Sequence, residues 1–405
     1  MSADLRLVKR PLRAVGDAAR GVARANRVPA DLCVVAEIDN HRQLERAYGS
    51  AIALTVRHLV RERARLLCDD VGGLTGDAGP RLLLVLDGAA TKALDEAGKS
   101  IVLERIIAAL GGQGVEFTWG TIFPVISARF ARPDESPFDI DDVESPRSAA
   151  MAGAVPPRAP YATDMAIAAA ALAALEDGDL RLDYQPICHT DDMTNVLYHE
   201  ALLRKVVGHE YEYPGAFIPA LERTGLVRRI DQWVVEAVIN RLHAHPDIRL
   251  GCNISAFSAV IDGWWASILA KLRAAPDVAS RLTIEITETA PLSALDAATH
   301  FVQTLQSIGC HVALDDVGVG YSNIETLVAL RPDVVKIDAV YVRRARSVAT
   351  GQHCLTHLVG LASSCASRVV IEGIESERDL DAARSSGAAW VQGYLPSQLS
   401  TQACV

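Results

Sequence analysis

The chain lacks a long apolar run and any cysteine arrangement typical of metal fingers. None of its 405 residues falls in an uninterrupted apolar stretch of 18, so no membrane-spanning helix is expected. No Cys-x-x-Cys pair occurs, and several cysteines lie in apolar runs, as buried thiols do. This usage predicts a reducing compartment and a cytoplasmic protein. The eight cysteines are Cys33, Cys68, Cys188, Cys252, Cys310, Cys354, Cys365 and Cys404.

Excess positive charge is also absent, because the formal net charge is −10. A dedicated binder of duplex DNA or RNA needs basic patches that release counterions, which disfavours that class. A nucleotide held by a few arginines and metal ions stays compatible with an acidic chain. Residues 1–26 scatter arginines among Leu, Val and Ala without the continuous apolar core of a secretion signal. They predict a basic amphipathic helix packed on its own domain, with a membrane or partner contact as the alternative.

The length predicts two domains. Buried strands at 32–38 and 82–86, helices at 41–69 and 89–110, and a strand pair within 117–130 indicate a small α/β or α+β domain. A stretch rich in proline and acidic residues follows and reads as a linker. We therefore divide the chain into an N-terminal helical segment (1–30), a small domain (31–132), a linker (133–163) and a C-terminal domain (164–402).

From about residue 164 short strands alternate with helices. Eight strands over about 240 residues predict an α/β fold of the TIM-like (β/α)₈ barrel type. The second strand follows the first through a short turn at 190–194, which favours a hairpin with one antiparallel strand. The expected strands are 180–187, 196–206, 249–255, 282–288, 311–317, 334–338, 368–375 and 390–394.

Nearly every expected barrel strand brings a carboxylate or an amide to its carboxyl end, and these ends meet at one mouth. A single acid there is usually a helix cap or a solvated edge. Six or more converging acids would repel one another unless positive charge lay among them. Oxygen ligands favour Mg²⁺ or Mn²⁺ over zinc, and two ions sharing a carboxylate suit phosphodiester hydrolysis. The residues are Glu200, Asn253, Glu285, Glu288, Asp315, Asp316, Asp338, Glu372, Glu375 and Gln392.

Two basic residues accompany the acids. Lys336 lies between Val335 and Ile337 in a buried strand, which favours a role at the attacking water or the developing negative charge over a surface lysine. Arg204 follows Glu200 by four residues on the same strand face, and its geometry suits a phosphate clamp. An ordinary ion pair with a rim carboxylate is the alternative for Arg204.

Nine motifs in order, between about 165 and 400, resemble the EAL family of cyclic di-GMP phosphodiesterases. The resemblance implies hydrolysis of cyclic di-GMP to linear pGpG with two Mg²⁺ or Mn²⁺ ions, inhibition by Ca²⁺, and a homodimer. The motifs are Tyr184-Gln-Pro-Ile187, Glu200-Ala-Leu-Leu-Arg204, Phe217-Ile-Pro219 with Thr224-Gly225, Asn253-Ile-Ser255, Glu285-Ile-Thr-Glu288, Asp315-Asp-Val-Gly-Val-Gly-Tyr-Ser322, Lys336-Ile-Asp338, Glu372-Gly-Ile-Glu375 and Gln392-Gly-Tyr394.

The resemblance also implies residue roles. Lys336 would orient the nucleophilic water, and Glu288 would anchor the loop after the fifth strand. The implied metal ligands are Glu200, Asn253, Glu285, Asp315, Asp316 and Glu372, of which Glu200, Asp315, Asp316 and Glu372 join Lys336 as catalytic residues. The implied substrate contacts are Gln185, Leu202, Arg204, Glu375 and Gln392.

Two departures stand out. The loop after the fifth strand carries Val317 and Val319 where the family usually has Phe and Thr, so it is expected to be held less firmly. The small domain resembles a degenerate GGDEF domain through Glu37-Ile-Asp-Asn40, but residues 77–81 lack the catalytic acid pair. We expect a regulatory or dimerising domain with an unidentified signalling partner, and Asp39 in a structural role.

Two alternatives differ in class from a phosphodiesterase specific for cyclic di-GMP. A receptor would bind the dinucleotide without cleaving it and signal through the small domain, but it would be expected to have lost metal ligands. A barrel enzyme of other metal-dependent phosphoester chemistry is disfavoured by the Glu-Ala-Leu-Leu-Arg and Gln-Gly-Tyr motifs.

Overall fold

The computed structural model describes residues 33–71, 73–78, 81–86, 95–131, 158–287, 295–319 and 324–399. The expected helix at 1–26, most of the predicted linker and Glu288 lie outside these residues. Contacts divide the chain into two compact units. One comprises the residues up to Ala170 with Arg223–Leu226 and Asp262–Ser267, and the other comprises the remainder. Within the described ranges, no helix has the length and apolar character needed to span a bilayer.

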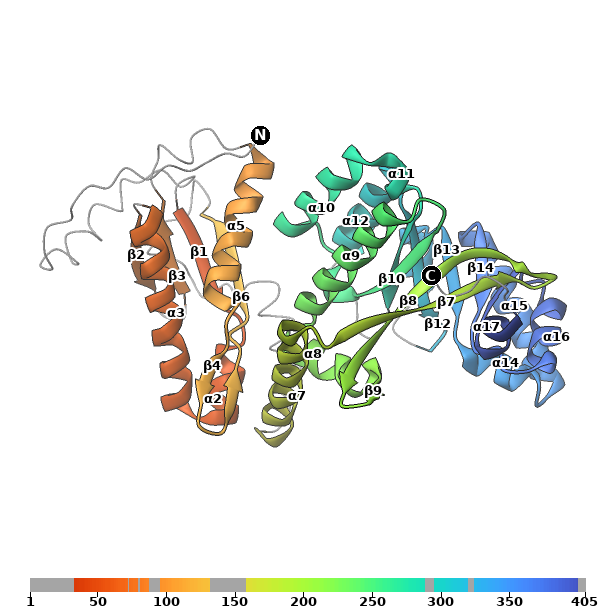
Figure 1. Ribbon diagram of the computed structural model, residues 1–405, viewed down its shortest axis with the longest axis horizontal. Helices are drawn as coiled ribbons and strands as arrows, with labels where there is room; N and C mark the ends of the chain where they lie inside the picture. Colours follow the sequence, from red (N-terminus) through yellow and green to blue (C-terminus); the bar gives the residue numbers. More distant parts are fainter. Residues whose placement is uncertain are drawn as a thin grey trace, which may run out of the picture. The chain divides into compact units, whose positions relative to one another are not determined.

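The N-terminal unit contains a four-stranded antiparallel sheet in the order β2-β3-β1-β6. Helices α3 and α5 pack on it and on each other (Figure 1). The strands are β1 (Cys33–Ile38), β2 (Leu74–Ala78), β3 (Arg81–Val85) and β6 (Ile126–Phe130), with a separate hairpin of β4 (Val115–Phe117) and β5 (Gly120–Ile122). The helices are α2 (His41–Tyr48), α3 (Ser50–Val71) and α5 (Glu96–Gly111).

Two features of this unit differ from the sequence-based expectation. The single helix expected over 41–69 is two helices, because Gly49 between them takes a φ of 91°, which a right-handed helix cannot continue. Strand β2 was not expected, since Leu74-Thr-Gly-Asp-Ala78 has no alternating apolar pattern. Its ladder with β3, rather than side-chain burial, makes it a strand.

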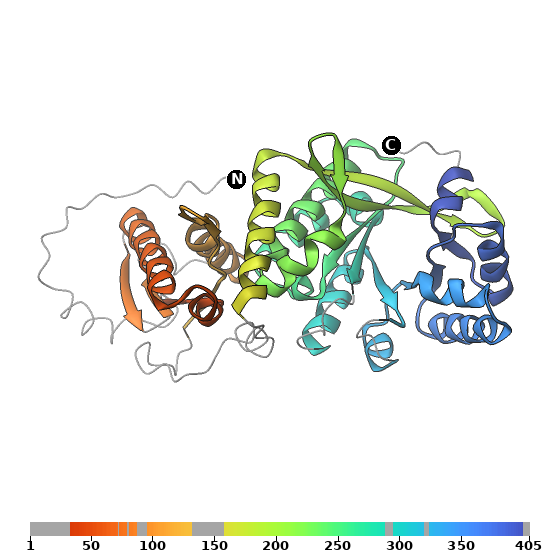
Figure 2. The ribbon, with the colours of Figure 1, turned by 90° about the horizontal axis from the view of Figure 1, so that it is seen from below.

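The second unit contains a barrel of eight strands, which Figures 1 and 2 show from two directions. Six parallel strands run from β10 to β15, and β10 also pairs with β8 to close the ring. The expected antiparallel strand is β7, which pairs antiparallel with both β8 and β15. The strands are β7 (Leu180–His189), β8 (Asp192–Val207), β10 (Leu250–Ser255), β11 (Leu282–Thr287), β12 (His311–Val317), β13 (Val334–Ile337), β14 (Arg368–Ile371) and β15 (Trp390–Gln392), and the short β9 (Glu210–Glu212) extends the sheet beside β8.

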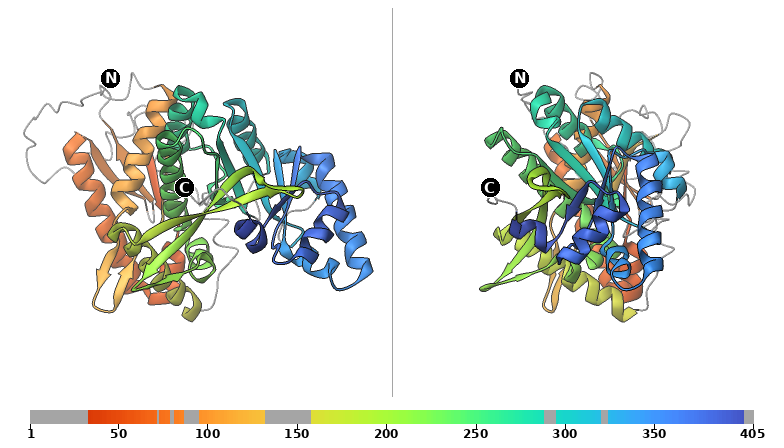
Figure 3. Two further views of the ribbon diagram at one scale, coloured as in Figure 1. Left: turned by 45° about the vertical axis from the view of Figure 1, so that its right-hand side comes forward. Right: turned by 90° about the vertical axis from the view of Figure 1, so that its right-hand side faces the viewer.

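Helices follow most strands, and α14, α15 and α16 pack side by side outside the barrel (Figure 3). Helix α16 shows how local sequence fixes an element: a Ser376/Asp379 capping box begins it, and Gly387 ends it in the left-handed conformation. The helices are α7 (Arg158–Asp177), α8 (Ile218–Thr224), α9 (Val227–Ala244), α10 (Gly263–Ala274), α11 (Pro276–Ala279), α12 (Leu295–Ser307), α13 (Ile324–Leu330), α14 (Ala339–Ala345), α15 (Ala349–Cys365), α16 (Glu377–Ser386) and α17 (Tyr394–Leu399).

Helix α7 begins at Arg158, inside the stretch expected to be linker. Pro160 occupies its first turn, where a missing N–H costs nothing because the first amides of a helix have no partner within it. The prolines of this stretch led us to expect a linker, although Pro160 in the first turn is compatible with a helix.

Candidate active site

The barrel interior is layered, and the site is the layer nearest the mouth. Side chains two apart on a strand point to the same face. An apolar cluster of Ile187, Leu197, Tyr198, Ala313, Val334 and Val370, with Trp390 packed against it, fills the layer below. Stepping two residues along four of these strands leads to polar groups, namely Tyr198 to Glu200, Ala313 to Asp315, Val334 to Lys336 and Val370 to Glu372. The strand register therefore sets a polar layer directly above an apolar floor.

The ammonium group of Lys336 lies among the carboxylates of this layer. The side chain is fully buried, and burial alone would lower its pKa, but the surrounding carboxylates raise the pKa well above its ordinary value. One ammonium among four carboxylates leaves excess negative charge. Its Nζ lies 2.8 Å from oxygens of Glu200, Glu285 and Glu372 and 3.3 Å from Asp315.

Glu200 is the most heavily bonded acid of the layer. Asn253 Nδ2 donates to its Oε1 at 2.5 Å, and Gln392 Nε2 donates to its Oε2 at 2.5 Å. Gln392 also donates to Gln185 at 3.0 Å, which links β15, β7 and β8. Burial would raise the pKa of Glu200, but Lys336 and these donors lower it below its ordinary value. Glu200 is thus held as a carboxylate.

The neighbouring acids show the opposite shift. Burial, followed by the charge of Glu200, raises the pKa of Glu285 to about 8. Burial also raises the pKa of Asp315 to about 6 and that of Glu372 well above its ordinary value. Because this layer is buried, its acids cannot all be charged at once. Some of them bind protons, which balance part of the negative charge. Bound cations would displace those protons.

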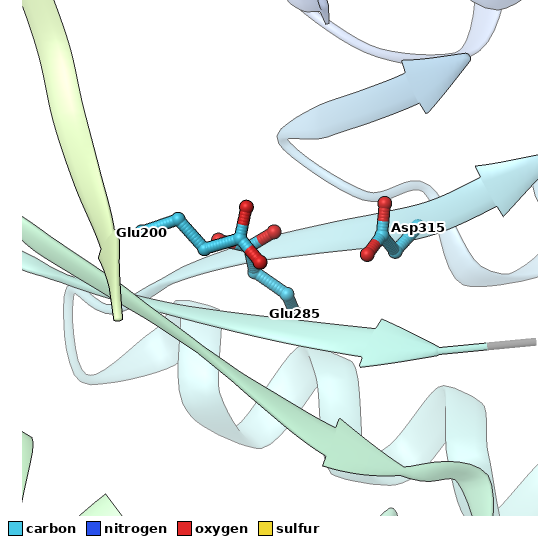
Figure 4. Close-up of side chains that lie close together, drawn as sticks. All are labelled: Glu200, Glu285 and Asp315. Carbon is cyan, nitrogen blue, oxygen red and sulfur yellow. The ribbon is translucent and has the colours of Figure 1, made fainter. Parts of the chain in front are cut away.

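Oxygen atoms of Glu200, Glu285 and Asp315 lie within 4.8 Å of one another, and Figure 4 shows the three carboxylates projecting from β8, β11 and β12 into one space. A second set consists of Asp315, Asp316 and Glu372. Asp316 holds a φ of 56°, a left-handed conformation uncommon outside glycine. The two sets share Asp315, an arrangement that would suit two neighbouring cations.

The donor set fits hard divalent cations. Oε1 of Glu285, Oδ1 of Asn253 and Oε1 of Gln392 are buried and accept no hydrogen bond from any described residue. Buried acceptors are costly unless something satisfies them, and a cation would do so. Every candidate ligand is an oxygen, which suits Mg²⁺ or Mn²⁺.

Two of the expected substrate contacts, Gln392 and Gln185, belong to the hydrogen-bond network of Glu200, whereas Arg204 is paired elsewhere. Arg204 forms an ion pair with Asp183 at 3.0 Å, and its guanidinium lies 4.9 Å from the ring centre of Tyr213. The rim ion pair considered from the sequence therefore exists, with Asp183 as its partner. Leu202 is half-buried between Glu200 and Arg204 on the same strand face, and Glu375 is exposed.

The loop after β12 is described up to Val319. Val317 is buried, whereas Val319 is 56% exposed. The Tyr341 hydroxyl on α14 donates to the Gly318 carbonyl at 2.6 Å, and Gly318 takes a φ of 103°. The tyrosine ring lies where a Cβ at position 318 would stand, so this turn requires glycine.

The barrel has a counterpart in a known protein family. The sequence model of the EAL domain matches residues 168–398, more than half of the chain. The chain belongs to the EAL domain family. The match spans all eight barrel strands and every candidate site residue, and it does not extend over the N-terminal sheet.

Curated proteins match about half of the chain. The cyclic di-GMP phosphodiesterase PdeF of Escherichia coli K12 is 31% identical over 227 residues, 55% of this chain and 30% of that protein. The bifunctional diguanylate cyclase and phosphodiesterase MucR of Pseudomonas aeruginosa is 29% identical over 230 residues, 55% of this chain and 33% of that protein. The matches cover about a third of these relatives.

Solved structures agree on the fold. The PaMucR phosphodiesterase, determined in complex with cyclic di-GMP, superposes with a TM-score of 0.51 at 27% identity over 57% of this chain and 95% of that one. The S helix-GGDEF-EAL part of Vibrio cholerae LapD covers 93% of each chain with a TM-score of 0.53. Its 15% identity shows a shared fold only.

Three residues around the site escaped sequence reasoning: Tyr198, Asp183 and Tyr213. Alternation alone could have found the first two, because Tyr198 precedes Glu200 by two residues and Asp183 precedes Gln185 by two. No pattern in the sequence brings Tyr213 to Arg204, since their contact depends on how the chain turns back after β8.

Proposed function

We propose that the EAL barrel hydrolyses cyclic di-GMP to linear pGpG, adding one water across a phosphodiester bond with Mg²⁺ or Mn²⁺ bound. The observation that carries this proposal is the buried layer in which four carboxylates surround Lys336 and further acceptor oxygens accept no hydrogen bond from the described part of the chain. The names of PdeF and MucR, and the nucleotide in the PaMucR complex, support cyclic di-GMP as the substrate.

The contacts described above support a role for each residue of the site. Glu200, Asn253, Glu285, Asp315, Asp316 and Glu372 would hold the cations, which when bound activate water and stabilise charge on the attacking and leaving oxygens. Lys336, buried and cationic, holds the attacking oxygen and offsets its developing charge. Arg204 would bind a phosphate, with Gln185, Leu202, Glu375 and Gln392 forming the rest of the substrate surface. Glu288 would anchor the loop after β12.

We further propose that the N-terminal unit is a degenerate GGDEF-like domain with a regulatory or dimerising role. Asp39 is buried and accepts a hydrogen bond from Ser127 at 2.7 Å, which supports a structural role for this acid. Residues 77–81 lack the acid pair that cyclase chemistry needs. Incubation of the chain with GTP should yield neither cyclic di-GMP nor pGpG, and either product would contradict this part of the proposal.

The test is turnover of cyclic di-GMP by the purified chain with Mg²⁺, Mn²⁺, Ca²⁺ or EDTA, resolved by chromatography. We expect pGpG with Mg²⁺ or Mn²⁺ and none with EDTA or Ca²⁺. Glu200→Gln should lower the rate by more than the roughly 10- to 100-fold that loss of a supporting residue costs. Glu210→Gln on the exposed β9 is the matched control. Binding without pGpG in every metal would instead identify a receptor.

A further inference from the structure

Tyr198 places a hydroxyl group in the barrel interior without a partner. Its side chain is 3% exposed, and the hydroxyl forms no hydrogen bond with any described residue. A buried phenol normally satisfies its hydroxyl, and a donor left unpaired in the interior destabilises the fold. The ring belongs to the apolar floor, which a phenylalanine would fill equally well. The floor alone therefore does not explain a tyrosine at this position.

Glu285 supplies a buried acceptor oxygen beside the Tyr198 ring. Its Oε1 is buried and accepts no hydrogen bond from a described residue, whereas its Oε2 lies 2.8 Å from Lys336 Nζ. Gly251 gives the spacing. A Cβ there would stand 2.5 Å from Cε2 of Tyr198 and 2.4 Å from Oε1 of Glu285. Cε2 of Tyr198 and Oε1 of Glu285 therefore lie on either side of this Cβ position and close to each other.

Gly251 also explains why the two groups can approach. It lies in the middle of β10, where glycine weakens a strand because it loses more freedom on folding than other residues. Any side chain at 251 would collide with both Tyr198 and Glu285. The missing side chain leaves the space in which a buried donor and a buried acceptor face each other.

We propose that Tyr198 is a positioning residue of the metal site, whose hydroxyl donates a hydrogen bond to the Glu285 carboxylate and so fixes its orientation toward the cation. The inference rests on the proposed function, because it requires Glu285 to be a metal ligand. Residues that hold a ligand in this way usually change metal affinity by about 10- to 100-fold.

The experiment compares Tyr198→Phe with the unchanged full chain. After metal is stripped with a chelator, binding of Mn²⁺ is measured by calorimetry, and thermal unfolding of the metal-free proteins is followed by circular dichroism. We expect Mn²⁺ to bind Tyr198→Phe about 10-fold or more weakly. The metal-free variant should unfold at the same or a higher temperature, because without metal the hydroxyl forms no hydrogen bond with a described residue.

The control is Tyr161→Phe, which also removes a buried phenolic hydroxyl, here one bonded to Asn40. It should lose some stability but keep its Mn²⁺ affinity. Equal Mn²⁺ affinity in Tyr198→Phe and the unchanged chain would overturn the positioning role and leave the proposed function standing. Failure of the unchanged chain to bind Mn²⁺ would overturn the proposed function, and the inference with it.

Discussion

Asp231 illustrates how much one buried side chain can carry. It lies on α9 and accepts hydrogen bonds from the Ser258 hydroxyl at 2.6 Å and the Ser255 amide at 3.1 Å. Ser255 in turn donates to Glu222 at 3.2 Å. Asp231 thereby attaches α9 to the turn after β10, two residues beyond the candidate ligand Asn253. Burial raises the pKa of Asp231 to about 7 despite these donors.

This shift predicts a pH dependence of stability. In the unfolded chain Asp231 ionises near 3.8, whereas in the fold it keeps its proton to about pH 7. Its contribution is therefore complete below about pH 4, is lost as pH rises from there to 7 and changes little above 7, on the order of 3 kcal/mol between pH 5 and 7. Asp231→Asn, which cannot ionise, should flatten the fall in the free energy of unfolding over this range in denaturant titrations. An unchanged slope would show that other groups set it.

Single residues also show what the sequence could and could not give. Alternation along a strand predicts that Glu200, Asp315 and Lys336 face the barrel interior, because it requires only local geometry. It does not predict that the Lys336 ammonium lies within 4 Å of four carboxylates. Nor does it give the Arg204–Asp183 ion pair, which depends on the register between β7 and β8.

Among the elements, the turn after β12 depends most on a neighbour. Its backbone passes through left-handed conformations at Asp316 and Gly318, and Tyr341 of α14 bonds the Gly318 carbonyl. Left-handed residues outside glycine are strained and persist only when their surroundings hold them. Helix α14 therefore supports the backbone that presents Asp315 and Asp316.

Tyr341→Phe should loosen this turn, since the lost hydrogen bond contributes roughly 1 kcal/mol. We expect kcat/KM for cyclic di-GMP to fall several-fold, with a higher Mn²⁺ concentration needed for half-maximal rate. The exposed Tyr211 of β9 offers the matched control, Tyr211→Phe, which should leave both values unchanged. Equal behaviour of the two variants would rule out a supporting role for α14.

Element prediction succeeded where apolar runs are long and failed where ladders or backbone conformation decide. The strand at 311–317 was predicted with the bounds it has, because its buried residues form one run. Strand β2 and the break at Gly49 carry no such pattern. The periodicity of apolar residues indicates which side chains are buried. Strand β2 is held by its backbone ladder and the break at Gly49 by a positive φ, and neither feature requires buried side chains.

For the whole molecule, Lys336 has a consequence for metal-free protein. Its ammonium and the protons on the acids whose pKa is raised offset the negative charge of the layer. We therefore expect that folding does not require a cation. We expect the chelated chain to remain folded by circular dichroism, unlike proteins with structural zinc. Mn²⁺ at 100 times its dissociation constant should then stabilise the barrel by about 2.7 kcal/mol. Loss of helical signal on chelation would contradict this.

The barrel closes where β7 pairs with β15, near the two ends of the domain in sequence. A ribosome synthesises Glu200 early, but Gln392, which donates to it, is added almost two hundred residues later. The ring cannot close on the emerging chain until the last strand has left the exit tunnel. During that interval the edge of β7 that later pairs with β15 has no partner strand, and an unpaired edge is a site at which chains associate. A chain that stops short of Trp390 would have neither a closed barrel nor a complete site.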